Sequence, residues 1–142
     1  MSEDYHPPTK SDLLNVIRME RARLNSLLEG LTDSQMIEPG VEASWSIKDI
    51  LAHIAAWERL AIDRIHATKS GEPLKFLLIK GDADVDKFNA EVFEKNTAEA
   101  LADIVSEYQA SHMTLSIKLK PLMMNSSPGH CHLIGLANSL PR

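Results

Sequence analysis

The 142-residue sequence has one cysteine, no long apolar run and few basic residues, and each of these shortages excludes a class of protein. Its single cysteine, Cys131, cannot form an internal disulfide, which is typical of a reducing compartment, and no nucleophile motif surrounds it. No apolar run approaches the roughly 18 residues that cross a bilayer, and the acidic N-terminus lacks the apolar core of a signal peptide. We therefore expect a cytoplasmic protein without a membrane segment.

Positive charge is also scarce. The 15 Lys and Arg residues are outnumbered by 20 Asp and Glu, and they form no stripe along the chain. Because nonspecific binding to nucleic acid depends on such a stripe, the composition excludes that function. With 44% hydrophobic residues and a length suited to one core, residues 1–142 should form a single domain, with 1–8 as a flexible arm and 123–142 as an atypical tail.

The stretch 44–59, Ser-Trp-Ser-Ile-Lys-Asp-Ile-Leu-Ala-His-Ile-Ala-Ala-Trp-Glu-Arg, predicts the central helix. Ser46 followed by Asp49 is an N-capping pattern, and the helix should run to about Lys69. His53 lies at the margin of its apolar stripe, where it is either a boundary residue with one hydrogen bond or a ligand. The stripe that should face the core is Ile47, Ile50, Ile54, Trp57, Ala61 and Ile65, with Lys48, Ala52, Arg59 and Asp63 on the other side.

Capping residues and helical periodicity predict the remaining elements as helices, which makes the fold class all-α. Residues 74–79 form an apolar run too short for a bundle helix, and we expect a loop there. The other elements are a helix from Thr9 to about Gly30, a single turn at 33–37, a helix over 82–96, and a last helix that Thr97 caps and Pro121 ends.

Polar residues interrupt the apolar faces of these helices. Glu58 falls inside an apolar face and needs a partner or an opening to water. Together with Glu20 it could supply metal ligands or a general base, although edge positions at the surface explain both acids equally well. Arg21 either extends along the surface or pairs across the bundle. His112 lies in the stripe of the last helix, where it is buried alone or brought near His53 or Glu58.

Residues 45–58 resemble the second-helix signature of the DinB-like four-helix bundle superfamily, and the surrounding sequence looks like its ClbS/DfsB branch. Asp86, Asn89 and Phe93 resemble the third segment of that branch, and the likeness runs from about Thr9 to Leu122. The resemblance implies an up-down helical bundle with a pocket between helices for an electrophilic metabolite. The ClbS-like relatives open a reactive ring.

The resemblance also implies a divalent metal such as zinc, nickel or iron. In the superfamily the histidine that His53 matches commonly joins two histidines one turn apart on the last helix. That pair is missing here, and in the ClbS-like branch the metal need not be present. The chain offers His130 and His132 instead, which could chelate only if extended. The alternative, which we favour, is a foreign ending with no selected role.

Two functions follow. The first is a small-molecule hydrolase or transferase, metal-dependent or not, with Glu58 as a base and His53 as the main metal ligand, followed by His112, His130 and His132. The second is a noncatalytic helical module for binding or oligomerisation, or a truncated inactive relative. Because the last bundle helix is expected to be missing or truncated, an uncovered groove should favour a homo-oligomer such as a dimer. The sequence leaves open whether the protein is an enzyme.

Overall fold

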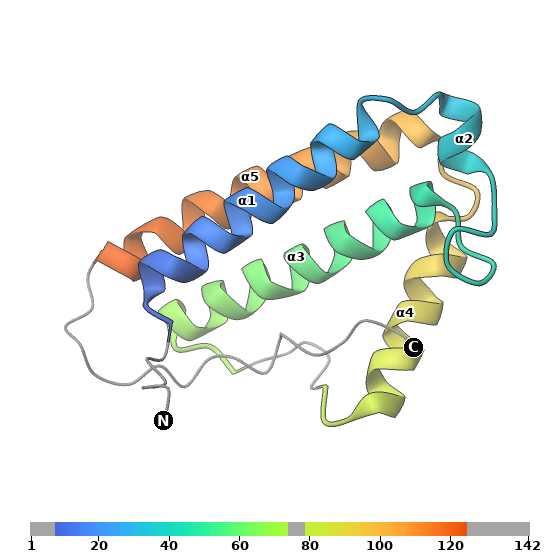
Figure 1. Cartoon of the computed structure of the whole chain (residues 1–142). Helices are drawn as coiled ribbons and strands as arrows, with labels where there is room; N and C mark the ends of the chain where they lie inside the picture. The colour runs from blue at the N-terminus through green and yellow to red at the C-terminus, as the bar shows by residue number, and fades with distance from the viewer. Residues whose placement is uncertain (1–7, 74–78, 125–142) are drawn as a thin grey trace, which may run out of the picture.

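The computed structural model describes residues 8–73 and 79–124, and this part of the chain is all-α, as predicted, with no strand. Figure 1 shows three long helices side by side, with α1 antiparallel to α3 and α5, and α4 at an angle below them. The short helix α2 covers one end of the bundle. The described helices are α1 (Lys10–Leu28), α2 (Asp33–Ile37), α3 (Ile47–Ser70), α4 (Asp82–Asn96) and α5 (Leu101–Met124).

The central helix α3 begins and ends where its sequence predicts. The Ser46 hydroxyl accepts a hydrogen bond from the Asp49 amide at 3.2 Å, and the Asp49 carboxylate accepts one from the Ser46 amide at 2.8 Å. This capping box satisfies two amide groups that the first turn of a helix leaves free. At the other end Gly71 adopts a left-handed conformation with φ 66°, which ends the helix at little steric cost.

The core lies between α3 and α5, and its fully buried residues on α3 are not those of the predicted stripe, although Ile47 and Ile54 of that stripe pack against it. Leu51, Ala52 and Ala55 of α3 pack against Ile104 and Tyr108 of α5. Ala52, expected on the outer side, is only 5% exposed, so that prediction was wrong. The larger residues of the predicted stripe are half-buried. The periodicity misled because α3 is apolar on two sides, and the buried side carries the small residues Ala52 and Ala55.

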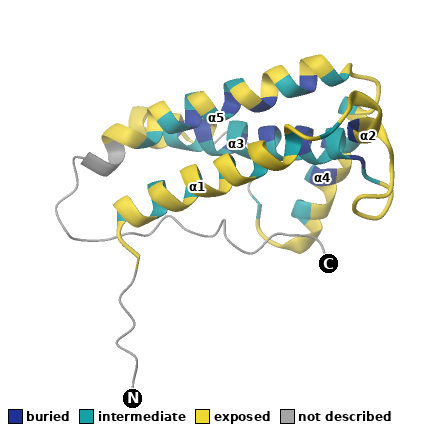
Figure 2. Ribbon diagram, turned by 45° about the horizontal axis from the view of Figure 1, so that its top comes forward, coloured by how far each residue is buried: buried dark blue, intermediate teal, exposed yellow. Residues whose placement is uncertain are grey.

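Helix α1 contributes little to this core. None of its residues is buried, and only Leu24 and Leu28 pack from its side against the buried cluster. Figure 2 shows α1 as the most exposed of the three long helices. Contacts from its polar side chains to α3 and α5 therefore matter for holding it in place.

The boundary between α4 and α5 differs from the prediction. Thr97 is the C-cap of α4, and its hydroxyl donates to the carbonyl of Phe93, so it does not cap the last helix. Pro121 lies inside α5, which continues to Met124, so Pro121 does not end that helix. An exposed proline near a helix end costs little because water can solvate the carbonyl it leaves unpaired.

The segment expected to form an atypical tail therefore starts with two helical residues, Met123 and Met124. The predictions for residues 1–7, 74–78 and 125–142 lie outside the described residues, and they include those for Cys131, His130 and His132.

Candidate functional site

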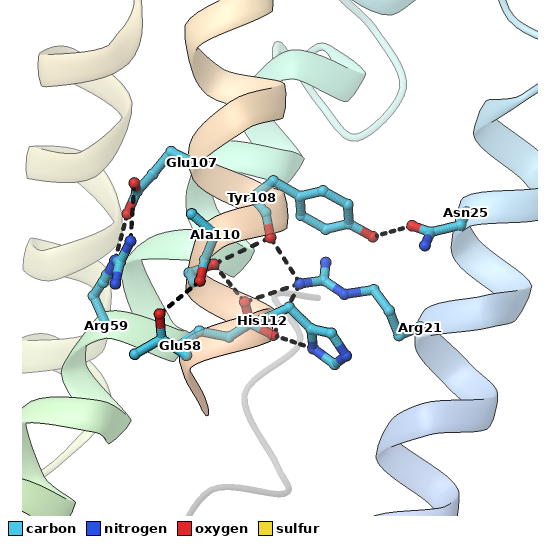
Figure 3. A network of polar contacts seen from close by, with 10 residues as sticks. Arg21, Asn25, Glu58, Arg59, Glu107, Tyr108, Ala110 and His112 are labelled. Atoms are coloured by element: carbon cyan, nitrogen blue, oxygen red, sulfur yellow. Dashed lines mark hydrogen bonds and ion pairs between the residues drawn. The ribbon is translucent and has the colours of Figure 1, made fainter. Parts of the chain in front are cut away.

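Glu58, near the middle of α3, is the centre of a polar cluster that joins the three long helices (Figure 3). Arg21 of α1 donates from one nitrogen to both carboxylate oxygens, at 3.1 and 3.0 Å. From α5, the Ser111 hydroxyl donates to Oε2 at 2.6 Å, and Nδ1 of His112 lies 3.1 Å from Oε1. The Glu58 side chain is only 14% exposed. Its need for a partner within the apolar face is therefore met from two neighbouring helices.

Arg21 pairs across the bundle, which is one of the two arrangements expected from the sequence. Its side chain is 9% exposed, and its Nη2 also donates to the Tyr108 carbonyl at 2.9 Å. The guanidinium carbon lies 3.6 Å from the centre of the Tyr108 ring, which adds a cation–π contact. Burial lowers the pKa of Arg21, and the Glu58 charge acts in the opposite direction. Glu20, the neighbouring acid, is exposed and does not join the cluster.

Tyr108 links the cluster to the packing of α1. The residue is 3% exposed, and its hydroxyl donates to Oδ1 of Asn25 at 2.9 Å. Burial raises the pKa of Tyr108 above its ordinary value, so the hydroxyl keeps its proton for this bond. The Tyr108 ring thus has the Arg21 guanidinium on its face, and its hydroxyl contacts the side-chain amide of Asn25 on α1.

His112 contributes the imidazole of the cluster. Because a carboxylate only accepts hydrogen bonds, a neutral His112 paired with Glu58 carries its proton on Nδ1 and leaves a lone pair on Nε2. The side chain is 20% exposed, so the ring is neither fully enclosed nor free in solvent. A histidine oriented by a buried carboxylate is a common general base.

His53 lies apart from this cluster, among aromatic rings that face α4. Its ring centre is 5.4 Å from that of Trp45 and 6.1 Å from that of Trp57. These two indoles contact Phe93 and Phe88, respectively, and Trp57 donates to Oδ1 of the buried Asn89 at 3.0 Å. The expected approach of His112 to another titratable residue of α3 is thus seen at Glu58 and not at His53.

The surroundings of the His53 imidazole favour its neutral form. Nδ1 is enclosed and has no hydrogen-bond partner among the described residues. Burial lowers the pKa of His53 below its ordinary value of 6.5. A metal-bound histidine usually donates its second nitrogen to a carboxylate or a carbonyl, and the described residues provide no such acceptor at Nδ1.

The described residues do not complete a metal centre around His53. Residues 8–73 and 79–124 contain no group of three or more His, Cys, Asp or Glu close enough to hold an ion. The nitrogen of His112 nearest to a carboxylate is engaged with Glu58. Further ligands to His53 would have to come from residues outside this part of the chain, and the metal stays a prediction.

Ser111 and Asn25 are members of the cluster that the sequence analysis missed. Ser111 is 0% exposed and stands in the core-facing stripe of α5, directly before His112. A small hydroxyl residue in an apolar stripe beside a histidine was the available signal. Asn25 offered none, because it lies on an exposed helix whose register against α5 the sequence does not fix.

Helical bundles often build their sites from polar side chains that project inward from facing helices, and this cluster has that form. The fold and the cluster thus define a helical-bundle protein with a polar site between its long helices. The chain belongs to the DinB superfamily, whose family model matches residues 17–116. That segment contains Arg21, His53, Glu58 and His112.

No curated protein and no solved structure matches the chain significantly. Within the described residues, every helix is too short or too polar to cross a membrane.

Proposed function

We propose that the protein is a small-molecule hydrolase or transferase of the ClbS/DfsB type, acting on an electrophilic metabolite. The observation that carries this proposal is the contact between Glu58 and His112 at 3.1 Å. Glu58 orients the imidazole, and Arg21 balances the carboxylate charge. The proposed site is cytoplasmic and lies between α1, α3 and α5.

In the proposed reaction Nε2 of His112 takes the proton of a water or thiol while its oxygen or sulfur attacks an electrophilic carbon. The bond from that carbon to its leaving atom breaks, and the leaving atom then receives the proton from Nε2. Opening a strained ring and displacing an ester oxygen both fit this balance. Glu58 accepts the hydrogen bond from Nδ1 and stabilises the imidazolium that forms between the two proton transfers.

Variants of His112 test the assignment. Purified protein is assayed against a panel of epoxides and activated esters, and the best substrate is used to compare variants. We expect His112→Gln to lower kcat/KM by about a hundredfold or more, the usual contribution of a general base. Glu58→Gln should also lower it, because an amide can donate to Nδ1 and favour the wrong tautomer.

His66→Gln is the matched control, because His66 is exposed on the same helix as Glu58 and away from the cluster. It should keep the full rate. If His112→Gln and His66→Gln both convert the substrate, and do so at the same rate, His112 is not the general base of the reaction. Failure of the whole panel to react would argue against an enzyme of this type.

A bound zinc, nickel or iron ion is a separate proposal that rests on the family resemblance and on the half-buried His53. Metal analysis of protein purified without a polyhistidine tag should find about one ion per chain, lost in His53→Ala. The same analysis of His130→Ala and His132→Ala shows whether these residues supply the missing ligands. Metal-free protein with an unchanged rate would reject this part of the proposal.

A noncatalytic oligomerisation module is the second candidate, and the exposed apolar side chains favour it. Met19 on α1 is 69% exposed, and Met113 and Ile117 on α5 are 63% and 62% exposed. The stripe of α3 from Ile50 to Ile65 is only half-buried. A dimer that covers such surface would raise the molar mass with concentration. Light scattering that shows a single-chain mass at all concentrations, with a sharp thermal transition, would reject it.

A further inference from the structure

A groove at the α2 end of the bundle adjoins the Glu58 cluster and opens away from its charged residues. It lies between the C-terminal part of α1, the turn into α2 and the first half of α5, and its volume is about 610 Å³. The groove is open to solvent, so a ligand bound there stays partly exposed. Asn25 and Tyr108 are common to the groove and the cluster, whereas Arg21, Glu58 and His112 do not line the groove.

The floor of the groove is apolar and firmly packed. Leu51 and Tyr108, which are 1% and 3% exposed, belong to the buried core, as does Met36 at 8%. Leu28 and Val105 line the groove and pack against the same core. Because these residues are fixed by the core, the floor exists before any ligand arrives, which lowers the ordering cost of binding.

The charged residues that line the groove are all negative. Glu29 and Asp33 lie on its rim, and no Lys or Arg lines it. Neither carboxylate has a hydrogen-bond or ion-pair partner among the described residues. The last turn of α1, which ends at the groove, also lacks a basic residue.

The partial charges of the helix ends beside the groove do not change the negative sign of its electrostatic potential. The C-terminus of α1 brings partial negative charge, and the N-termini of α5, at Leu101, and of the short helix α2, at Asp33, bring partial positive charge. These partial charges have opposite signs and are each smaller than one full charge, so the two carboxylates decide the sign of the potential. An apolar floor with an anionic rim fits a ligand with an apolar body and one positive charge.

We propose that this groove binds a hydrophobic amine, with the apolar body on Leu28, Leu101 and Val105 and the ammonium at Glu29 and Asp33. The ammonium supplies the cation that both rim acids lack. An amide or hydroxyl of the ligand can reach Asn25, Ser106 or Gln109, the uncharged polar residues of the lining. This site goes beyond the proposed reaction and does not depend on it.

Calorimetric titration of the full chain with n-octylammonium, n-octanol and n-octanoate tests the proposal, since the three probes share one apolar body. Octylammonium should bind at least about fivefold tighter than octanol, the preference expected from two partly exposed ion pairs, and octanoate should bind weakest. Equal affinity for the three probes, or no binding of octylammonium, would overturn the proposal.

Two variants locate the binding. Glu29→Gln with Asp33→Asn should remove the preference for octylammonium over octanol, whereas Asp86→Asn with Glu94→Gln, which removes the same charge from exposed positions of α4, should keep it. Ala102→Trp places a large side chain in the groove from an exposed position and should abolish binding of all three probes. A preference that persists without Glu29 and Asp33, or binding unaffected by Ala102→Trp, contradicts the assignment. None of these variants alters the Glu58 cluster, so the reaction assay fails or succeeds independently.

Discussion

Replacing Arg21 by Met should destabilise the protein much more than the same change at Arg59, although both arginines form ion pairs with a glutamate. Arg21 and Glu58 are 9% and 14% exposed, whereas Arg59 and Glu107 are 40% and 47% exposed. Methionine keeps most of the apolar stem, so the comparison isolates the charged group. The two pairs thus differ mainly in burial.

The magnitude follows from what each arginine loses. Arg21→Met removes two hydrogen bonds to Glu58, one to the Tyr108 carbonyl and the contact with the Tyr108 ring. Breaking a fully buried pair costs about 3 to 5 kcal/mol, but Ser111 and His112 still contact Glu58. We expect a loss of about 2 to 3 kcal/mol, against less than about 1 kcal/mol for Arg59→Met.

Urea unfolding followed by circular dichroism measures both values. A double variant, Arg21→Met with Glu58→Leu, should return to within about 1 kcal/mol of the wild type, because it leaves no unpaired charge in the cluster. Ser111 can then still donate to the Tyr108 carbonyl, 3.2 Å away. Similar losses in Arg21→Met and Arg59→Met would refute the reasoning, as would a double variant less stable than Arg21→Met alone.

Two further predictions concern α3. Because burial lowers the pKa of folded His53 below 6.5, the unfolded chain takes up the His53 proton at a higher pH than the folded protein, and stability should fall as the pH drops below about 6.5. In urea titrations His53→Phe should lose less stability than the wild type between pH 7 and 5.5. An equal or larger loss would contradict the assignment. Ser46→Ala should cost about 1 to 2 kcal/mol of unfolding free energy because Ser46 is 2% exposed and its hydroxyl caps α3, and the same change at the exposed cap Thr9 should cost less in the same assay.

Local signals in the sequence predicted the helices well. The capping boxes at Thr9 and Ser46 depend on residues three positions apart, so their geometry does not require knowledge of the rest of the fold. The same locality explains the error at Thr97, since a threonine between two helices can donate back to the preceding turn or cap the following one.

The packing face and the site required tertiary information. Both the isoleucine stripe of α3 and its Leu51, Ala52 and Ala55 face are apolar, and periodicity does not tell which of the two is fully buried against α5. The sequence showed Glu58 and His112 as polar residues on apolar helix faces, but their pairing depends on the register between α3 and α5. The contribution of Ser111 depends on the same register.

The tautomer of the His112 imidazole tests the central claim most directly, because a base at Nε2 requires the proton to be on Nδ1. Nitrogen NMR of the full chain, at a pH where the ring is neutral, distinguishes the two forms. We expect His112 protonated on Nδ1 in the wild type, with the proton shifting toward Nε2 in Glu58→Leu, since the Nε2 form is the ordinary one without an acceptor. A wild-type His112 protonated on Nε2 would contradict both the Glu58 contact and the mechanism built on it.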